Sequence, residues 1–193
     1  MLKEKLSKYN LILASKSPRR QFLLKELGLD FEIRTKNVDE SFPKKLKGKQ
    51  IAIFLCKKKA EAFKHELKSN DLLITADTIV WIDNKVLNKP AGYNEAVKML
   101  KLLSEKMHTV YTGVSLTSAA KQQTFFAETK VFFKKLTDKE IDFYVRNYKP
   151  YDKAGAYGAQ EWIGYVAVKK IIGSYFNVMG LPVKELYEEL MKL

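Results

Sequence analysis

Apolar and polar residues alternate along the chain in short blocks that predict strands and helices in turn. The apolar run from Leu11 to Ala14 is typical of a buried strand. Ser17-Pro18 suits a helix start, because serine accepts a hydrogen bond from a free backbone N–H and proline lacks a donor that would be unpaired there. An amphipathic segment from Phe22 to Leu27 follows, and Gly28 ends it. The first thirty residues therefore predict a strand, a turn and a helix.

The alternation continues to the last residue. The pattern predicts strands at 31–34, 72–75, 108–117, 123–133 and 165–172, a hairpin over 79–87, and helices at about 50–68, 94–103, 137–147 and from 182. We expect the two long strands to pair around Ala119-Ala120-Lys121. Thr137 and Glu140 have the spacing of a capping box. Strand–helix alternation combined with hairpins indicates an α/β protein, and the lack of repeats or linkers predicts one domain over residues 1–193.

Composition supports a globular protein with a strong positive charge. The chain has 193 residues, 46% of them hydrophobic, with 35 Lys and Arg against 22 Asp and Glu, so its formal charge is +13. This charge predicts attraction to anions in general and does not choose among nucleotides, nucleic acids and membrane surfaces. The lysine runs at 44–47 and 57–59 are expected to be solvated surface, because no aromatic stacking platform accompanies them.

Cysteine and histidine are scarce. Cys56 is the single cysteine, and only His65 and His108 could join it, so neither an internal disulfide nor a structural zinc site is expected. We expect Cys56 to pack in a helix and the histidines to have no catalytic role, because no partner lies at motif spacing. No apolar run approaches a membrane span or a signal-peptide core, so a cytoplasmic protein that does not enter membranes is expected.

Residues 15–20, Ser-Lys-Ser-Pro-Arg-Arg, form the first candidate site. Backbone N–H groups at a helix start, the hydroxyls of Ser15 and Ser17, and the guanidinium groups of Arg19 and Arg20 would surround one point beyond the strand. Only four of the basic residues are arginines, and two are adjacent, which favours a need for the planar fork that grips phosphate oxygens. The alternative is an ordinary capped helix with two surface arginines.

Asp77 is the second candidate. It follows the apolar strand 72–75, and ligands in open α/β sheets bind at the carboxyl ends of strands. There its carboxylate would hold Mg²⁺ or orient an attacking water, and the alternative is a loop aspartate in an Asx-turn. Glu40, beside Asp39, and Lys89, stiffened by Pro90, would add a second carboxylate and a cation. Together they have the donors that a metal–polyphosphate site requires.

The segment from Asp152 to Gln160 is the third candidate. Its glycines allow close approach of the backbone, and the amide of Gln160 offers a donor and an acceptor that match the edge of a base. An ordinary tight turn would have the same composition. The sequence therefore leaves open whether this loop recognises a base.

Taken together, these segments resemble the Maf family of nucleoside triphosphate pyrophosphatases. The resemblance runs over nearly the whole chain in the expected order. It rests on Ser15-Lys16-Ser17-Pro18-Arg19-Arg20, Asp39-Glu40, Lys59-Ala60, Ala76-Asp77-Thr78, Lys89-Pro90, His108 to Val110 with Thr112 to Val114, Asp152 to Gln160, Gly173-Ser174-Tyr175 and Gly180-Leu181-Pro182.

The resemblance implies an α/β fold similar to the inosine triphosphatases, with a mixed, twisted sheet covered by helices and two lobes around a cleft. It implies a homodimer that uses Mg²⁺ or Mn²⁺ to hydrolyse nucleoside triphosphates to monophosphate and pyrophosphate. Asp77 looks like the proton acceptor or metal ligand and Glu40 its support. The implied phosphate contacts are Ser15, Arg19, Arg20, Lys59 and Lys89. The implied specificity positions are Arg19, Thr78 and Gln160, the last in a loop with Asp152, Lys153 and Tyr157.

The loop ending in Gln160 resembles the branch of the family that acts on dTTP and UTP, with modified pyrimidine triphosphates as further substrates. The chain departs from the family at three places: the family usually has Ile at Ala159, Gly at Glu161 and Ser-Gly at Ser104-Glu105. Two alternatives stay open: the same chemistry on modified purine triphosphates, and a basic nucleic-acid-binding or cell-division regulatory module. Carboxylates beside the phosphate residues count against the nucleic-acid alternative, because they would repel a phosphodiester backbone.

Overall fold

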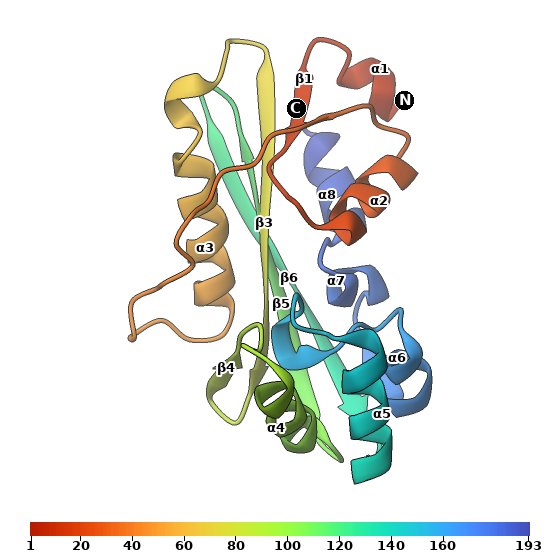
Figure 1. Ribbon diagram of the computed structural model, residues 1–193. Helices are drawn as coiled ribbons and strands as arrows, with labels where there is room; N and C mark the ends of the chain where they lie inside the picture. The colour runs from red at the N-terminus through yellow and green to blue at the C-terminus, as the bar shows by residue number, and fades with distance from the viewer. The chain divides into compact units, whose positions relative to one another are not determined.

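The structure is a computed structural model that describes residues 1–193. Figure 1 labels most of its elements. The strands are β1 (Asn10–Leu13), β2 (Glu32–Ile33), β3 (Asp71–Ile82), β4 (Lys85–Leu87), β5 (Met107–Thr117), β6 (Gln122–Phe133) and β7 (Val168–Ile172). The α-helices are α1 (Leu2–Lys5), α2 (Pro18–Glu26), α3 (Lys49–Glu61), α4 (Tyr93–Leu103), α5 (Asp138–Tyr148), α6 (Trp162–Ala167), α7 (Tyr175–Met179) and α8 (Val183–Leu190). Two 3₁₀ turns, η1 (Lys64–Glu66) and η2 (Ala154–Ala156), complete the chain.

The seven strands form one mixed sheet, which confirms the expected α/β class. The strand order is β2-β1-β3-β5-β6-β7, with β4 paired to β3 off this path. β1 pairs in parallel with β2 and β3, whereas β3–β4 and β6–β7 are antiparallel. None of the helices is both long enough and apolar enough to cross a membrane.

Several elements form as their local signals predict. The side chain of Ser17 caps α2, and Pro18 is its first residue. Thr137 and Glu140 form the capping box of α5. Asp83 and Asn84 both have positive φ in the turn between β3 and β4, as two-residue hairpin turns require. The backbone N–H of Ser118 donates to the carbonyl of Lys121 at 2.8 Å, which closes the expected turn between β5 and β6.

Three expected elements differ from the structure. The helix expected to reach residue 68 ends at Glu61. The strand expected over 72–75 is the start of β3, which continues to Ile82, so Asp77 lies within a strand and not at its end. The segment 162–167 is the helix α6, and only 168–172 is a strand. Ile163 and Ala167, four residues apart on α6, are both completely buried, as one face of a helix allows.

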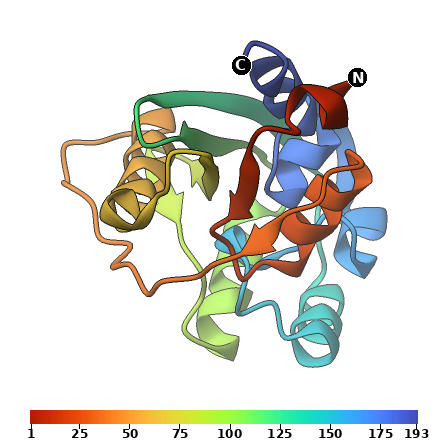
Figure 2. The same ribbon diagram turned by 90° about the horizontal axis from the view of Figure 1, so that it is seen from above.

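The chain divides into two compact units. The first unit comprises residues 1–77, 112–127 and 180–193, and the second comprises 78–111 and 128–179. Both chain termini belong to the first unit, where they lie side by side (Figures 1 and 2). One apolar cluster of the first unit joins β1, α3 and β3 through Ile12, Ala60 and Leu73.

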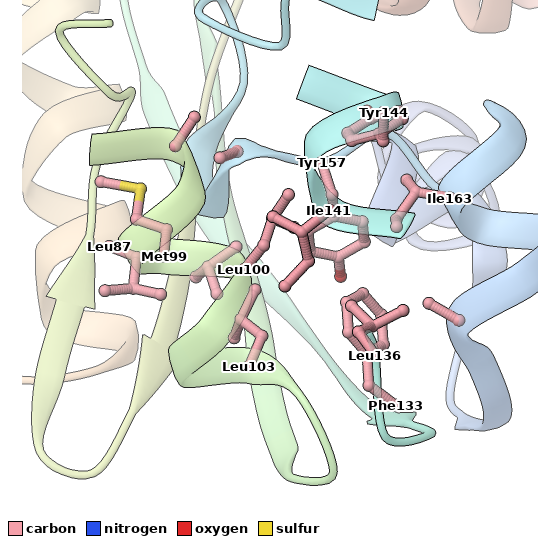
Figure 3. Close-up of a cluster of buried hydrophobic side chains, with 14 of the residues drawn as sticks. Leu87, Met99, Leu100, Leu103, Phe133, Leu136, Ile141, Tyr144, Tyr157 and Ile163 are labelled. Carbon is pink, nitrogen blue, oxygen red and sulfur yellow. The ribbon is translucent and has the colours of Figure 1, made fainter. Parts of the chain in front are cut away.

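The second unit has an apolar core of its own. Figure 3 shows this cluster, in which side chains of α4 and α5 meet Leu87 of β4, Phe133 of β6 and Ile163 of α6. Two tyrosines, Tyr144 on α5 and Tyr157 on the loop after η2, lie in the same cluster. These rings connect the loop 152–160 to the core.

Helix α3 is fixed against the sheet of the first unit at two points. A Cβ added to Gly113 of β5 would lie 2.5 Å from the carbonyl oxygen of Ala52, so only glycine permits this approach. The hydroxyl of Thr75 on β3 donates to the carbonyl of Cys56 at 2.8 Å. Cys56 is buried in α3, as expected. The position of α3 is therefore set by backbone contacts with β3 and β5.

Candidate active site

Asp77 faces helix α3. Residues two apart in a strand point to the same side of the sheet, so Asp77 shares the side of Thr75, which bonds to Cys56 of α3. Lys59 lies three residues after Cys56, nearly one helical turn further along α3. The packing of α3 thus brings an ammonium group to a carboxylate that is 9% exposed.

Lys59 joins the two carboxylates that the sequence singled out. Its ammonium group donates to Oδ1 of Asp77 and, at 2.9 Å, to Oε1 of Glu40. The side chain of Lys59 is 17% exposed, whereas that of Glu40 is 44% exposed. The expectation that residues 57–59 are solvated surface is therefore wrong for Lys59, because its charge is used between two acidic groups.

The neighbouring pair repeats this arrangement nearer to solvent. Lys58 donates to Oδ2 of Asp39 at 3.0 Å and to the carbonyl of Ser41 at 3.1 Å. Hydrogen bonds from Ser41 and Lys58 lower the pKa of Asp39 to about 2. Two consecutive acidic residues are thus held by two consecutive lysines of α3, which fixes the loop that carries Glu40.

Burial and charge act in opposite directions on Asp77. Burial raises the pKa of the Asp77 carboxyl above its ordinary value, and the positive charges of Lys59 and Arg20 offset part of this increase. Burial lowers the pKa of Arg20, while Asp77 raises it. A buried carboxylate with a raised pKa is a better proton acceptor than an exposed one.

Arg20 also holds the backbone together. Its Nε donates to the carbonyl of Gly180 at 2.8 Å, and its Nη1 donates to the carbonyl of Ala76 at 2.9 Å. Arg20 therefore ties the start of the last segment of the chain to β3, directly beside Asp77. This second task of Arg20 was not predicted from the sequence.

The two serines of the first candidate site shape the turn before α2. The backbone N–H of Ser17 donates to Oγ of Ser15 at 3.2 Å, and Oγ of Ser17 accepts from the backbone N–H of Arg20 at 3.5 Å. The side chain of Gln21 donates to the carbonyl of Ser15 at 3.1 Å. These bonds orient the first turn of α2, which carries Arg19 and Arg20.

The carboxylates of Asp77 and Glu40 suit a divalent cation of the Mg²⁺ type. Both bind the same ammonium group, so they lie close enough to share one ion. No group of three or more His, Cys, Asp or Glu side chains gathers anywhere in the chain. Mg²⁺ requires only one or two carboxylates when water and substrate phosphates complete its shell. The donor set therefore fits a metal that binds together with a phosphate ligand.

The remaining candidate residues belong to the second unit, where the loop 152–160 lies against β3 and β4. The backbone N–H of Gly155 donates to the carbonyl of Asn88 at 3.2 Å, next to Lys89. A Cβ on Gly155 would lie 2.9 Å from the side chain of Val80. Gly155 has a φ of +70°, so glycine is required there for conformation and for space. The structure thus brings Lys89 beside this loop.

Within the loop, Tyr157 and Gln160 have different surroundings. Tyr157 is buried, and its hydroxyl bonds to Nε2 of His108 at 2.8 Å. Burial lowers the pKa of His108 to about 3, so the ring is neutral at ordinary pH. The side chain of Gln160 differs, because its buried Oε1 atom has no hydrogen-bond partner. An unpaired buried acceptor is costly unless a ligand donates to it.

The structure collects the candidates in two groups and adds residues that the sequence did not indicate. The first unit holds Ser15, Ser17, Arg19, Arg20, Glu40, Lys59 and Asp77. The second unit holds Thr78, Lys89, Asp152, Lys153, Tyr157 and Gln160. Lys58 and Tyr144 were missed, and Gly113 was named only within the segment Thr112 to Val114 of the family resemblance. The spacing 39–40 against 58–59 is a weak signal for Lys58, whereas nothing in the sequence predicts the contact between Gly113 and α3.

Comparisons with known proteins agree with the resemblance. A family model described as "Maf-like protein" matches residues 10–193. A dTTP/UTP pyrophosphatase of Bacteroides thetaiotaomicron is 53% identical over 189 residues, which are 97% of this chain and 98% of that protein. A dTTP/UTP pyrophosphatase of Flavobacterium johnsoniae is 53% identical over 193 residues and the full length of both chains.

A solved structure shares the fold. The Ham1 protein of Staphylococcus aureus superposes with a TM-score of 0.51, covering 95% of this chain and 98% of that one, at 15% sequence identity. This likeness confirms the expected inosine-triphosphatase-like fold.

Proposed function

The chain belongs to the Maf-like protein family, and from this premise we propose that it hydrolyses dTTP and UTP to the nucleoside monophosphate and pyrophosphate. The observation that carries the proposal is the buried carboxylate of Asp77, which Lys59 joins to Glu40 in a chain about half identical to dTTP/UTP pyrophosphatases. Such a cluster supplies the base and the charges that phosphate anhydride cleavage requires.

Asp77 accepts a proton from the attacking water. The water oxygen bonds to the α-phosphorus, the bond from that phosphorus to the α,β-bridging oxygen breaks, and pyrophosphate leaves with that oxygen. The raised pKa of Asp77 favours this role, because a base is more effective when its pKa approaches the working pH. Lys59 keeps Asp77 oriented through their direct contact.

Cationic side chains hold the phosphates. Arg19 and Arg20 stand in the first turn of α2, where backbone N–H groups also favour anions. Arg19 offers the planar fork for two phosphate oxygens, and Arg20 keeps this turn in place through its bonds to Ala76 and Gly180. Lys59 and Lys89 add positive charge, and Ser15 and Ser17 hold the turn that presents the arginines.

The carboxylates of Asp77 and Glu40 would hold the divalent cation, Mg²⁺ or Mn²⁺, that accompanies the triphosphate. When bound, this cation neutralises charge on the phosphate oxygens. The ammonium group of Lys59 lies at both carboxylates and limits their mutual repulsion in the absence of the cation.

Gln160 recognises the base. Uracil and thymine present an N3–H donor between two carbonyl groups, and Oε1 of Gln160 is a buried acceptor without a partner. Cytosine carries an acceptor at N3, so it lacks the N3–H donor that uracil and thymine offer to Oε1. Thr78 and the loop residues Asp152, Lys153 and Tyr157 belong to the same recognition task in our proposal.

We further infer a single-domain, homodimeric, cytoplasmic enzyme. The match of one family model over residues 10–193 supports a single domain. One buried cysteine is in keeping with a reducing compartment. The homodimer follows the family resemblance.

A panel of nucleoside triphosphates tests the reaction and the base preference together. Pyrophosphate and orthophosphate are measured separately for dTTP, UTP, CTP, ATP and GTP, with Mg²⁺ or Mn²⁺. Pyrophosphate and a monophosphate are expected, fastest from dTTP and UTP. Stepwise orthophosphate release would contradict the reaction, and a preference for ATP or GTP would favour the purine alternative. Gln160→Ala is expected to reduce the difference in cleavage rate between UTP and the nucleoside triphosphates with other bases.

A further inference from the structure

Glu161 departs from the family resemblance and occupies a central place in the second unit. Its Oε1 receives the ammonium group of Lys153 at 2.9 Å. Its Oε2 accepts a hydrogen bond from the hydroxyl of Tyr144. Its side chain is 19% exposed. A glycine at this position, which the family resemblance implies, would provide neither contact.

The contacts of Glu161 close a chain of polar bonds around the loop that carries Gln160. The hydroxyl of Tyr144 donates to Glu161 and accepts from the backbone N–H of Gly158 at 3.1 Å. Tyr144 is completely buried and belongs to the apolar core (Figure 3). Lys153 at the start of the loop, Gly158 within it and Glu161 just after it are therefore tied to one rigid helix, α5.

Glu161 also balances a buried charge. The side chain of Lys153 is 9% exposed and pairs with Asp152 at 2.7 Å and with Glu161 at 2.9 Å. The side chain of Asp152 is 58% exposed, so solvent screens its ion pair with Lys153. Removing one partner of a buried pair leaves the other charge poorly compensated. Glu161 is thus the more shielded counterion of Lys153.

Gly158 shows how closely Glu161 and Gln160 are coupled. A Cβ built on Gly158 would lie 2.9 Å from the carboxyl carbon of Glu161 and 3.0 Å from Nε2 of Gln160. Both side chains therefore lie over the same α-carbon. A shift of the Glu161 carboxylate would open space into which the Gln160 amide can turn.

We propose that Glu161, through Lys153 and Tyr144, is a positioning residue that holds the amide of Gln160 in the orientation that selects uracil and thymine. The proposal rests on the proposed function. Glu161 does not touch the substrate; it fixes the backbone on both sides of Gln160 and occupies the space beside its amide. When the amide is fixed, its oxygen faces the base and selects a base with N3–H. When the amide is free, it can rotate so that its NH₂ group donates to N3 of cytosine, and cytosine then binds equally well.

Three variants test this role. Glu161→Ala removes both contacts, Glu161→Gln keeps an acceptor but loses the charge, and Tyr144→Phe removes one hydroxyl while leaving both charges. The control is Glu188→Gln, which deletes an exposed carboxylate that pairs with Lys184 on α8. For each protein, kcat and KM are measured with UTP and CTP, together with the melting temperature.

We expect Glu161→Ala to lower the ratio of kcat/KM for UTP over CTP by about three- to tenfold, the scale of one hydrogen bond. Glu161→Gln is expected to restore part of that ratio, and the control to leave it unchanged. A purely structural role would lower the rates for both nucleotides equally. If Glu161→Ala melts below the assay temperature, the UTP/CTP ratios of Glu161→Gln and Tyr144→Phe test the proposal instead. Each of these variants keeps part of the hydrogen-bond network around Glu161.

The outcomes separate this proposal from the proposed function. An unchanged UTP/CTP ratio in all three variants would overturn the role of Glu161, provided that Gln160→Ala alters the ratio. If Gln160→Ala also leaves it unchanged, base reading lies elsewhere and both the role of Gln160 and this proposal fail. If the wild-type protein cleaves no nucleoside triphosphate, the proposed function itself is wrong.

Discussion

Gly113 of β5 and Ala52 of α3 approach so closely that a Cβ on Gly113 would lie 2.5 Å from the carbonyl oxygen of Ala52. Ala52 and Lys59 are seven residues apart, two turns of the same helix, so they lie on nearly the same side of α3. The contact that positions α3 on the sheet is therefore connected, through a rigid helix, to Lys59, which pairs with Asp77 and Glu40.

Gly113→Ala is expected to push α3 away from the sheet. Overpacking of this kind costs about 1–3 kcal/mol, and the displaced Lys59 would orient Asp77 less well. Both the melting temperature and kcat should fall. Gly92→Ala is the matched control, because nothing lies within 4 Å of its added Cβ. A wild-type kcat in Gly113→Ala would show that the position of α3 on the sheet does not affect catalysis.

Asp77→Asn is expected to abolish turnover and leave nucleotide binding. The amide has the shape of the carboxylate but neither its charge nor its basicity, and loss of a general base lowers rates by about 10²–10⁴-fold. Asp30→Asn, which changes an exposed carboxylate paired with Lys3, serves as the control and should keep its rate. Turnover, nucleotide affinity and melting temperature are measured on the same preparations. Wild-type turnover in Asp77→Asn would overturn the assignment of the active site.

The pH dependence of kcat/KM follows from the environment of Asp77. The base must be ionised, and burial raises its pKa above the ordinary value of 3.8, so activity should fall as the pH is lowered through a value above 3.8. Lys59→Met removes a positive charge that lowers this pKa, and the acidic limb should move to higher pH. Lys57→Met, at an exposed position of α3, is the control. If the acidic limb of the kcat/KM profile of Lys59→Met stays in place or moves to lower pH, the electrostatic coupling between Lys59 and Asp77 is contradicted.

Arg19→Lys and Arg20→Lys should fail in different ways. Arg20 donates to two backbone carbonyls, which lysine cannot reproduce with the same geometry, so Arg20→Lys should destabilise the fold by about 1–3 kcal/mol. Arg19→Lys should keep the melting temperature and lose activity, because a point charge cannot replace a fork on phosphate oxygens. Urea unfolding and steady-state kinetics distinguish the two. Unchanged kinetics in Arg19→Lys would indicate a solvated surface group.

Glu105 occupies a backbone conformation that favours glycine. Its φ is +61°, in the left-handed region that glycine adopts most readily. Glu105→Gly should stabilise the fold by about 1 kcal/mol, because the strain of a side chain in this region slightly exceeds the entropy that glycine gains in the unfolded chain. Glu105→Ala, which keeps the strain and removes only the carboxylate, is the control. A lower melting temperature in Glu105→Gly than in Glu105→Ala would contradict this account.

Features that depend on near neighbours in the chain were predictable from the amino-acid order. The cap of α2 by Ser17, the capping box of Thr137 and Glu140, and the turn at Asp83-Asn84 all formed as predicted. Each is a local hydrogen-bond or dihedral preference that holds whatever the rest of the chain does. The order of the candidate motifs also indicated the family before any contact was known.

Contacts between residues that are distant in the chain could not be predicted in this way, because they form only when the chain folds. Asp77 was expected after a strand, yet pairing with neighbouring strands extends β3 through it to Ile82. The charge pattern alone placed Lys59 among three surface lysines and the resemblance made it a phosphate contact, but only packing of α3 placed it against Asp77, 18 positions away. Glu161 was only a departure from a motif until Lys153 and Tyr144 gave it partners. The sequence alone does not show which opposite charge a charged side chain will pair with, because burial and the folded path of the backbone determine its neighbours.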